Sequence, residues 1–182
     1  LGDPMSRIPL PEPETIDPFL QEMHNGASPN DWSTQRVARA FASQPRLLED
    51  YLTFYYPWHL EKGLIPARTK ELVRLHIANL NGCHTCASAR LAADSVAEAE
   101  ALGALRGDED GLAALSEEEL TALSFAERLA LSHHTITDGD VKLWRETFGD
   151  EGFVELAMMT AQYIGFGRVL AMLQLETVAC PI

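Results

Sequence analysis

Hydrophobic residues recur along most of the chain at intervals of three and four positions, which is the spacing of one face of an α-helix. No run of alternating β-branched residues bounded by turn residues stands out, so strands are not expected. The pattern therefore predicts an all-α protein, a bundle of several helices with an extended N-terminal arm.

The N-terminal segment over residues 5–30 is rich in proline, which interrupts helices because it lacks a backbone N–H. We expect an extended arm there, with at most a short helix near Phe19 to Met23. Residues 31–182 are expected to form a single helical domain. Leu1 to Pro4 precede the first methionine, and we interpret them as an addition made for expression.

Proline and glycine divide the domain into helices. Pro57 is expected to end or kink one helix, and Asn81-Gly82 to stop the next, since glycine readily adopts a left-handed exit. The expected helices span residues 32–43, 46–56, 66–80, 83–94, 96–102, 117–133, 141–147 and the stretch that follows Asp150.

Two serines are each followed three residues later by glutamate, the pattern of a capping box at a helix start: Ser95 with Glu98, and Ser116 with Glu119. The most apolar late stretch, over residues 153–175, still contains charged and amide side chains. We therefore expect it to be a buried helix and not a membrane span.

The charge balance excludes several kinds of partner. The chain has 27 acidic residues against 14 lysines and arginines, a formal net charge of −13, which repels nucleic acids and anionic lipid surfaces. Hydrophobic residues make up 46%, enough for a folded core. With three cysteines and no secretory leader pattern, we expect a soluble, cytoplasmic protein without a disulfide framework.

The most informative segment contains Cys83 and Cys86, three residues apart at the start of an expected helix. Both sulfurs then lie on one face of the first turn, where the free N–H groups favour a thiolate. Arg90 is expected on the same face. If the helices form a hairpin at the glycine, Glu71 approaches Arg90, which gives the order Glu71, Arg90, Cys86. His84, between the cysteines, could shuttle protons.

Less specific interpretations of these residues stay open. A CxxC pair is often structural, and Glu71 with Arg90 could be a plain surface ion pair. Zinc would need two further ligands, and no second CxxC or spaced histidine pair accompanies His76 and His84. The remaining candidates are expected to be surface, interface or bystander residues: His24, His59 and Cys180.

Several segments together resemble the carboxymuconolactone decarboxylase-like superfamily, and within it the members similar to alkylhydroperoxidase D. They are Arg-Ile-Pro-Leu-Pro at 7–11, Arg-Thr-Lys-Glu-Leu-Val at 68–73, Leu-Asn-Gly-Cys-His-Thr-Cys at 80–86, and Phe-Ala-Glu-Arg-Leu-Ala at 125–130. The most specific feature is a glutamate followed by eleven residues and then CxxC.

The resemblance implies an all-helical fold that assembles as a homo-oligomer. It also implies that Cys86 attacks a peroxide, that Cys83 resolves the product, and that Glu71 belongs to a proton relay. Arg90 stands where the family has a histidine, and arginine does not release its proton in a protein. Arg90 could still stabilise a thiolate while Glu71, His84 or water moves the proton.

The leading hypothesis is a thiol-dependent peroxidase or disulfide oxidoreductase that needs a small hydroperoxide and an external dithiol, and no metal, haem or flavin. One alternative is an enzyme of the carboxymuconolactone decarboxylase type, which would act on a small carboxylated lactone without thiol chemistry. The other is a catalytically silent oligomeric binding protein.

Overall fold

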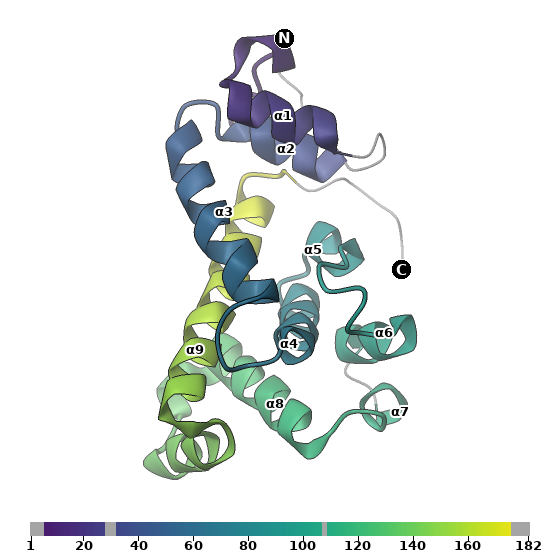
Figure 1. Cartoon of the computed structure of the whole chain (residues 1–182), viewed down its shortest axis with the longest axis vertical. Helices are drawn as coiled ribbons and strands as arrows, with labels where there is room; N and C mark the ends of the chain where they lie inside the picture. The colour runs from purple at the N-terminus through teal and green to yellow at the C-terminus, as the bar shows by residue number, and fades with distance from the viewer. Residues whose placement is uncertain (1–5, 28–31, 107–108, 176–182) are drawn as a thin grey trace. The chain divides into compact units, whose positions relative to one another are not determined.

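The structure is a computed structural model that describes residues 6–27, 32–106 and 109–175. In these residues every regular element is helical and none is a strand (Figure 1). The predicted all-α class is therefore confirmed. Residues 1–4 and Cys180 lie outside the described residues, so the expectations for them stay predictions.

The chain divides into two compact units, one formed by residues 1–55 with 168–182 and the other by residues 56–167. Two helices, α3 (Pro45–Leu60) and α9 (Asp138–Met172), contribute residues to both units. The division expected from the sequence, an arm over 5–30 and one helical domain over 31–182, stays a prediction.

The first unit contains η1 (Pro13–Thr15), α1 (Pro18–Gly26) and α2 (Trp32–Ala40). Helix α1 is longer than the short helix expected near residues 19–23. Its first turn is capped, because the Asp17 carboxylate accepts a hydrogen bond from the backbone N–H of Phe19 at 2.9 Å. Pro18 occupies the first helical position, where no N–H is needed. The N-terminal segment is thus more helical than an extended arm.

The second unit is built around α4 (Ala67–Leu80), in which every residue from Thr69 to Ala78 is buried. Helix α4 packs against α6 (Glu98–Arg106) and α8 (Glu117–Ser132) (Figure 1). The remaining elements of this unit are α5 (His84–Ser88), α7 (Glu109–Leu112) and η2 (His133–Thr135). Charged side chains on a helix as buried as α4 require partners inside the protein.

Pro57 does not end α3, which continues to Leu60. Proline removes one helical hydrogen bond, but the turn that follows it is held by other contacts. The buried ammonium group of Lys70 donates to the carbonyl oxygens of Trp58 and, at 2.8 Å, of Lys62. The expected helix end at residue 56 was therefore wrong by one turn.

Helix ends elsewhere match the sequence in part. Gly82 has a φ of 62°, so the predicted left-handed stop after α4 is confirmed. Ser116 and Glu119 form the predicted capping box at the start of α8. The capping box expected at Ser95 and Glu98 is absent, because α6 begins at Glu98, two residues later than expected. Glu100 instead accepts a hydrogen bond from the backbone N–H of Ala97 at 3.0 Å.

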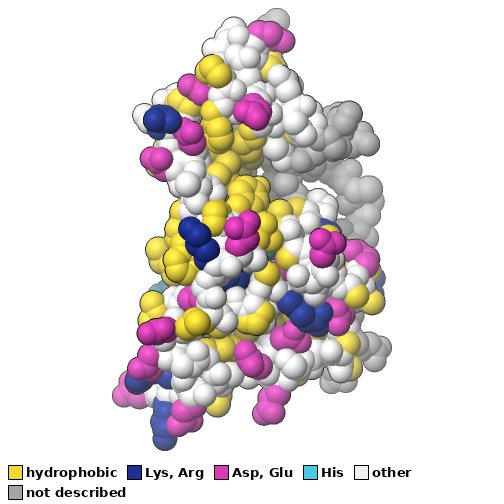
Figure 2. All heavy atoms as spheres, viewed as in Figure 1, with side chains coloured by type: hydrophobic (Ala, Val, Ile, Leu, Met, Phe, Trp, Pro, Cys, Tyr) yellow, Lys and Arg dark blue, Asp and Glu magenta, His cyan; other side chains and the backbone are white. Residues whose placement is uncertain are grey.

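Helix α9 joins the two helices that were expected on either side of residue 150. They meet at a kink where Gly149 has φ 69° and ψ 167°. Among the described residues, no helix is both long and apolar enough to cross a membrane. Acidic side chains are spread over the face drawn in Figure 2, in keeping with the net charge of −13.

The loop between α3 and α4 offers a test of this packing. Gly63 has a φ of 91°, and a Cβ atom there would lie 2.2 Å from the Glu155 carboxylate, which pairs with buried Lys70 at 3.1 Å. We expect Gly63→Ala to lower the free energy of unfolding by about 1 to 3 kcal/mol, measured by urea denaturation.

Gly26→Ala is the matched control, because Gly26 ends α1 and a Cβ atom there would meet nothing within 4 Å. That variant should keep or slightly raise the stability. Equal urea midpoints for the two variants would contradict the placement of Gly63 against Glu155.

Candidate active site

The candidate site is organised by Glu71, a fully buried carboxylate on α4. Its Oε2 accepts hydrogen bonds from Arg74 Nε at 2.7 Å and from His59 Nε2 at 3.0 Å. Its Oε1 accepts from Arg74 Nη2 at 2.8 Å and from the backbone N–H of Leu91 at 2.9 Å. One carboxylate therefore holds together parts of α3, α4 and the segment after α5.

These donors keep Glu71 ionised. Burial on its own raises the pKa of Glu71, but the hydrogen bonds and charge of Arg74 and the hydrogen bond from His59 outweigh it and lower the pKa to about 2. A carboxylate with this pKa does not hold a proton near neutral pH. Glu71 therefore acts as a fixed negative charge that orients its partners.

Arg74 connects this carboxylate to the cysteine segment. Its Nη1 donates to the carbonyl oxygen of Cys86 at 2.6 Å, and its Nη2 donates to that of Ala89 at 2.7 Å. The guanidinium is itself buried, with Glu71 as its counter-ion. The planar fork of arginine suits this arrangement, because it can donate in several fixed directions at once.

His59 and Tyr163 complete the buried network. Because ionised Glu71 can only accept, the Nε2 atom of His59 carries the hydrogen in that contact. In the neutral ring Nδ1 is then an acceptor for the Tyr163 hydroxyl group, at 2.8 Å. Burial lowers the pKa of His59, and the hydrogen bond to Glu71 offsets part of that effect. The Tyr163 hydroxyl group, the His59 ring and the Glu71 carboxylate thus form a continuous chain of hydrogen bonds.

Cys83 and Cys86 are joined by a disulfide bond in the turn that begins α5. Cys83 caps the helix, since its Sγ accepts from the backbone N–H of Cys86 at 3.2 Å. The two residues differ in accessibility: Cys83 is buried, with 1% of its surface exposed, and Cys86 is partly exposed. The two sulfurs that the spacing placed on one face of the first turn are therefore close enough to bond.

The backbone of α9 passes close to this turn. Asn81 Nδ2 donates to the carbonyl oxygens of Tyr163 at 3.3 Å and Ile164 at 3.2 Å. At Gly167 a Cβ atom would lie 2.8 Å from Asn81 Nδ2 and 3.9 Å from Cys86 Sγ. At this point α9 forms one wall beside the Cys86 sulfur.

Arg90 is not where the sequence placed it, and the expected order Glu71, Arg90, Cys86 was wrong. Arg90 pairs with Glu98, whose side chain is 64% exposed, and its Nη1 donates to the carbonyl oxygens of Ala87 at 2.6 Å and residue 89 at 3.0 Å. Arg74 takes the place between the carboxylate and the cysteines.

The reason is that α5 is much shorter than the helix expected over residues 83–94. It ends at Ser88, and Ala89 adopts an extended conformation. Beyond that point Arg74 binds the Ala89 carbonyl, and Leu91 donates to Glu71 rather than to a helical carbonyl. Arg90 is consequently not part of the helix that begins at the two cysteines. Among the sequence candidates, Glu71 is linked to Cys86 through Arg74.

The other sequence candidates are placed as follows. His84 is the first residue of α5 and is exposed. His59 was expected at the surface or an interface, and the structure buries it completely. Arg74 and Tyr163 were not among the residues predicted from the sequence. Position 74 could have been found, because residues three apart on a helix lie side by side. Nothing local in the sequence connects Tyr163 to Glu71.

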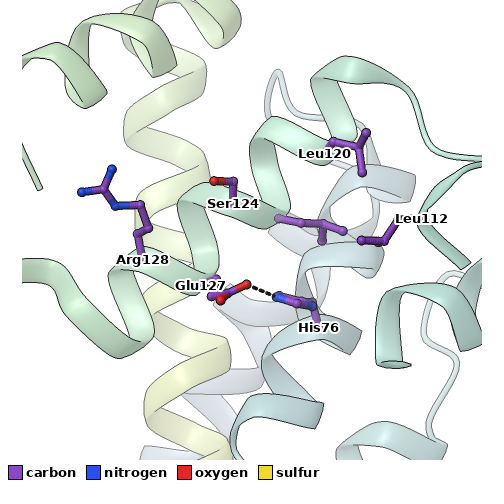
Figure 3. A pocket seen from close by; sticks show the side chains of 7 residues that line it. His76, Leu112, Leu120, Ser124, Glu127 and Arg128 are labelled. Carbon is purple, nitrogen blue, oxygen red and sulfur yellow. Dashed lines mark hydrogen bonds and ion pairs between the residues drawn. The ribbon is translucent and has the colours of Figure 1, made fainter. Parts of the chain in front are cut away.

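His76 lies on a different face of α4 from Glu71, beside a pocket of about 270 Å³ (Figure 3). Its Nδ1 donates to the Ala104 carbonyl oxygen at 3.1 Å, and its Nε2 lies 3.3 Å from Glu127 Oε2. Within residues 6–27, 32–106 and 109–175, no group of three or more His, Cys, Asp or Glu side chains could hold a metal ion.

The fold is that of the alkylhydroperoxidase AhpD core. A peroxidase-related protein from Ralstonia eutropha JMP134, described as such a core, superposes with a TM-score of 0.74 at 19% identity, over 96% of this chain and 93% of that one. A peroxidase-related protein from Silicibacter sp. TM1040 gives 0.65 at 19% identity, over 94% and 91%. These neighbours confirm the resemblance at the level of fold.

Comparisons by sequence add nothing to this likeness. No protein-family model matches the chain, and no curated protein matches it either.

The buried carboxylate makes stability depend on pH. The folded-state pKa of Glu71 lies below its ordinary value of 4.5, so its contribution is complete above that value and is lost as the pH falls toward 2. We expect Glu71→Gln to lower the free energy of unfolding by about 3 kcal/mol or more at pH 7, because Arg74 is left buried without a counter-ion. Urea denaturation at pH 7 and pH 3 measures both effects.

Glu98→Gln is the control for this variant, since it removes an exposed carboxylate that pairs with an arginine. Its effect should stay within about 0.5 kcal/mol. A Glu71→Gln protein as stable as Glu98→Gln at pH 7 would contradict the role given to the buried pair.

Proposed function

We propose that the protein is a thiol-dependent peroxidase and disulfide oxidoreductase that uses Cys86 and Cys83. The observation that carries the proposal is a disulfide whose more exposed member is Cys86. The carbonyl oxygen of Cys86 accepts a hydrogen bond from Arg74, which forms a buried ion pair with Glu71. The likeness in fold to proteins described as peroxidase-related supports the same class of reaction.

In the proposed cycle the Cys86 thiolate attacks the terminal oxygen of a hydroperoxide, the O–O bond breaks, and the alcohol or water leaves with a proton. Cys86 becomes a sulfenic acid. The Cys83 sulfur then attacks it, which releases water and forms the disulfide. An external dithiol returns both cysteines to the reduced state. The homo-oligomer implied by the resemblance stays a prediction.

Arg74 is the group proposed to stabilise the Cys86 thiolate. It is held against the Cys86 peptide in a region shielded from water, where the effect of a charge is larger than at the surface. The partner of Arg90, Glu98, has a side chain that is 64% exposed, so water screens the charge of that second pair more strongly. The role expected of Arg90 is thus proposed for Arg74.

Proton transfer is proposed to involve histidine rather than Glu71, whose pKa of about 2 makes it a weak base. His84 is exposed at the start of α5 and can exchange protons with water near the sulfurs. His59 and Tyr163 are positioning residues, because they hold Glu71 in the orientation that fixes Arg74.

The first test is a thiol count. Reduced protein with Cys180 replaced by serine should lose two thiols per chain when treated with cumene hydroperoxide, with formation of the Cys83 to Cys86 disulfide. Cys86→Ser in the same background should lose the reaction, because the attacking sulfur is gone. Undiminished peroxide reduction by the Cys86→Ser protein would show that this sulfur is not the nucleophile.

The second test compares the two arginines. In reduced protein, Arg74→Gln should raise the pKa of the Cys86 thiol by about one unit, because a nearby positive charge is removed. Arg90→Gln should leave that pKa unchanged. The pH dependence of the alkylation rate of Cys86 measures both, with circular dichroism as the check that each variant is folded. A raised pKa in Arg90→Gln alone would favour the order expected from the sequence.

A further inference from the structure

We propose that the reducing dithiol attacks Cys86 Sγ and that Cys83 leaves as the thiolate, so that the covalent intermediate with the reductant forms on Cys86. This inference rests on the proposed function, because a catalytic disulfide must be reduced again in every cycle. It assigns both halves of that cycle to the same sulfur.

The two cysteines are unequally accessible. A thiolate must reach the sulfur that it attacks, and the sulfur that leaves can be buried. Cys83 has 1% of its surface exposed, whereas Cys86 is partly exposed between exposed His84 and Ser88. Attack on Cys83 would require the turn to open, and attack on Cys86 would not.

The turn also supports Cys83 as a leaving group. Its Sγ already accepts a hydrogen bond from the backbone N–H of Cys86 at 3.2 Å, and this bond strengthens when the sulfur becomes an anion. The turn therefore already holds a hydrogen-bond donor against the sulfur that becomes a thiolate when Cys83 departs.

The surroundings of Cys86 restrict how a reductant approaches. On one side α9 is close enough that a Cβ atom at Gly167 would lie 3.9 Å from Cys86 Sγ. Arg74 fixes the Cys86 and Ala89 carbonyl oxygens, so the peptide that carries the attacked sulfur is held in place. The reductant must therefore reach Cys86 Sγ from the side away from α9.

The exchange proceeds in two steps. A reductant thiolate forms a bond to Cys86 Sγ as the bond between Cys86 and Cys83 breaks, and the electron pair of that bond goes to Cys83. The second thiol of the reductant, once deprotonated, then displaces Cys86, which leaves as a thiolate. The reductant ends as its own disulfide and both cysteines are reduced, so two electrons are transferred.

Glutathione tests the first step, because a monothiol cannot complete the second. Oxidised protein carrying Cys180→Ser is mixed with excess glutathione, quenched in acid and alkylated with N-ethylmaleimide, and the peptide over residues 75–90 is fragmented by mass spectrometry. We expect glutathione on Cys86 in at least tenfold excess over Cys83. Equal labelling, or glutathione mainly on Cys83, overturns the proposal.

Single-cysteine variants give a second measurement. With Cys180 also replaced, Cys83→Ser leaves Cys86 alone and Cys86→Ser leaves Cys83 alone. Cys86 in the Cys83→Ser protein should react with 5,5′-dithiobis(2-nitrobenzoic acid) at least ten times faster than Cys83 in the Cys86→Ser protein. Equal or inverted rates overturn the proposal. Neither experiment uses a peroxide. A protein that exchanges at Cys86 but reduces no hydroperoxide would refute the proposed function and leave this inference standing.

Discussion

The interaction on which the site depends is the buried ion pair between Glu71 and Arg74. Taking both charges out of water is costly, and only further hydrogen bonds offset that cost. Glu71 receives them from His59 and from the backbone of Leu91, and Arg74 gives them to two carbonyl oxygens at the end of α5. The pair can therefore exist only when these segments are in place. In turn, it fixes the peptide that carries Cys86.

This arrangement gives two chemically similar residues different environments. Cys83 is buried and accepts a hydrogen bond at its sulfur, whereas Cys86 reaches the surface and has its carbonyl group held by a guanidinium. A symmetric pair of thiols would give no direction to either oxidation or reduction. Burial and hydrogen bonding thus distinguish the two cysteines, and on the proposed cycle the more exposed one meets substrates while the buried one resolves and leaves.

The sequence predicted those features that depend on local chemistry. Helical spacing, the stop at Gly82 and the capping box of Ser116 with Glu119 are properties of a few neighbouring residues, and all are confirmed. The closeness of the Cys83 and Cys86 sulfurs follows from their separation in the same way, whereas their oxidation to a disulfide was not predicted.

The features that depend on tertiary contacts were missed. Nothing near residue 89 indicates that α5 ends there, because its backbone groups are taken by Arg74 and Glu71 from another helix. For the same reason Arg90 was placed on the wrong face. His59 and Tyr163 are 104 positions apart, and only the folded chain brings their side chains together.

The most direct measurement of the central claim is to trap the oxidised sulfur itself. In a protein with Cys83 and Cys180 replaced by serine, the Cys86 sulfenic acid has no internal thiol with which to condense. After one equivalent of hydroperoxide, dimedone should label Cys86 in most chains, as located by mass spectrometry. An unlabelled Cys86, in protein shown by its circular dichroism spectrum to be folded, would contradict the account.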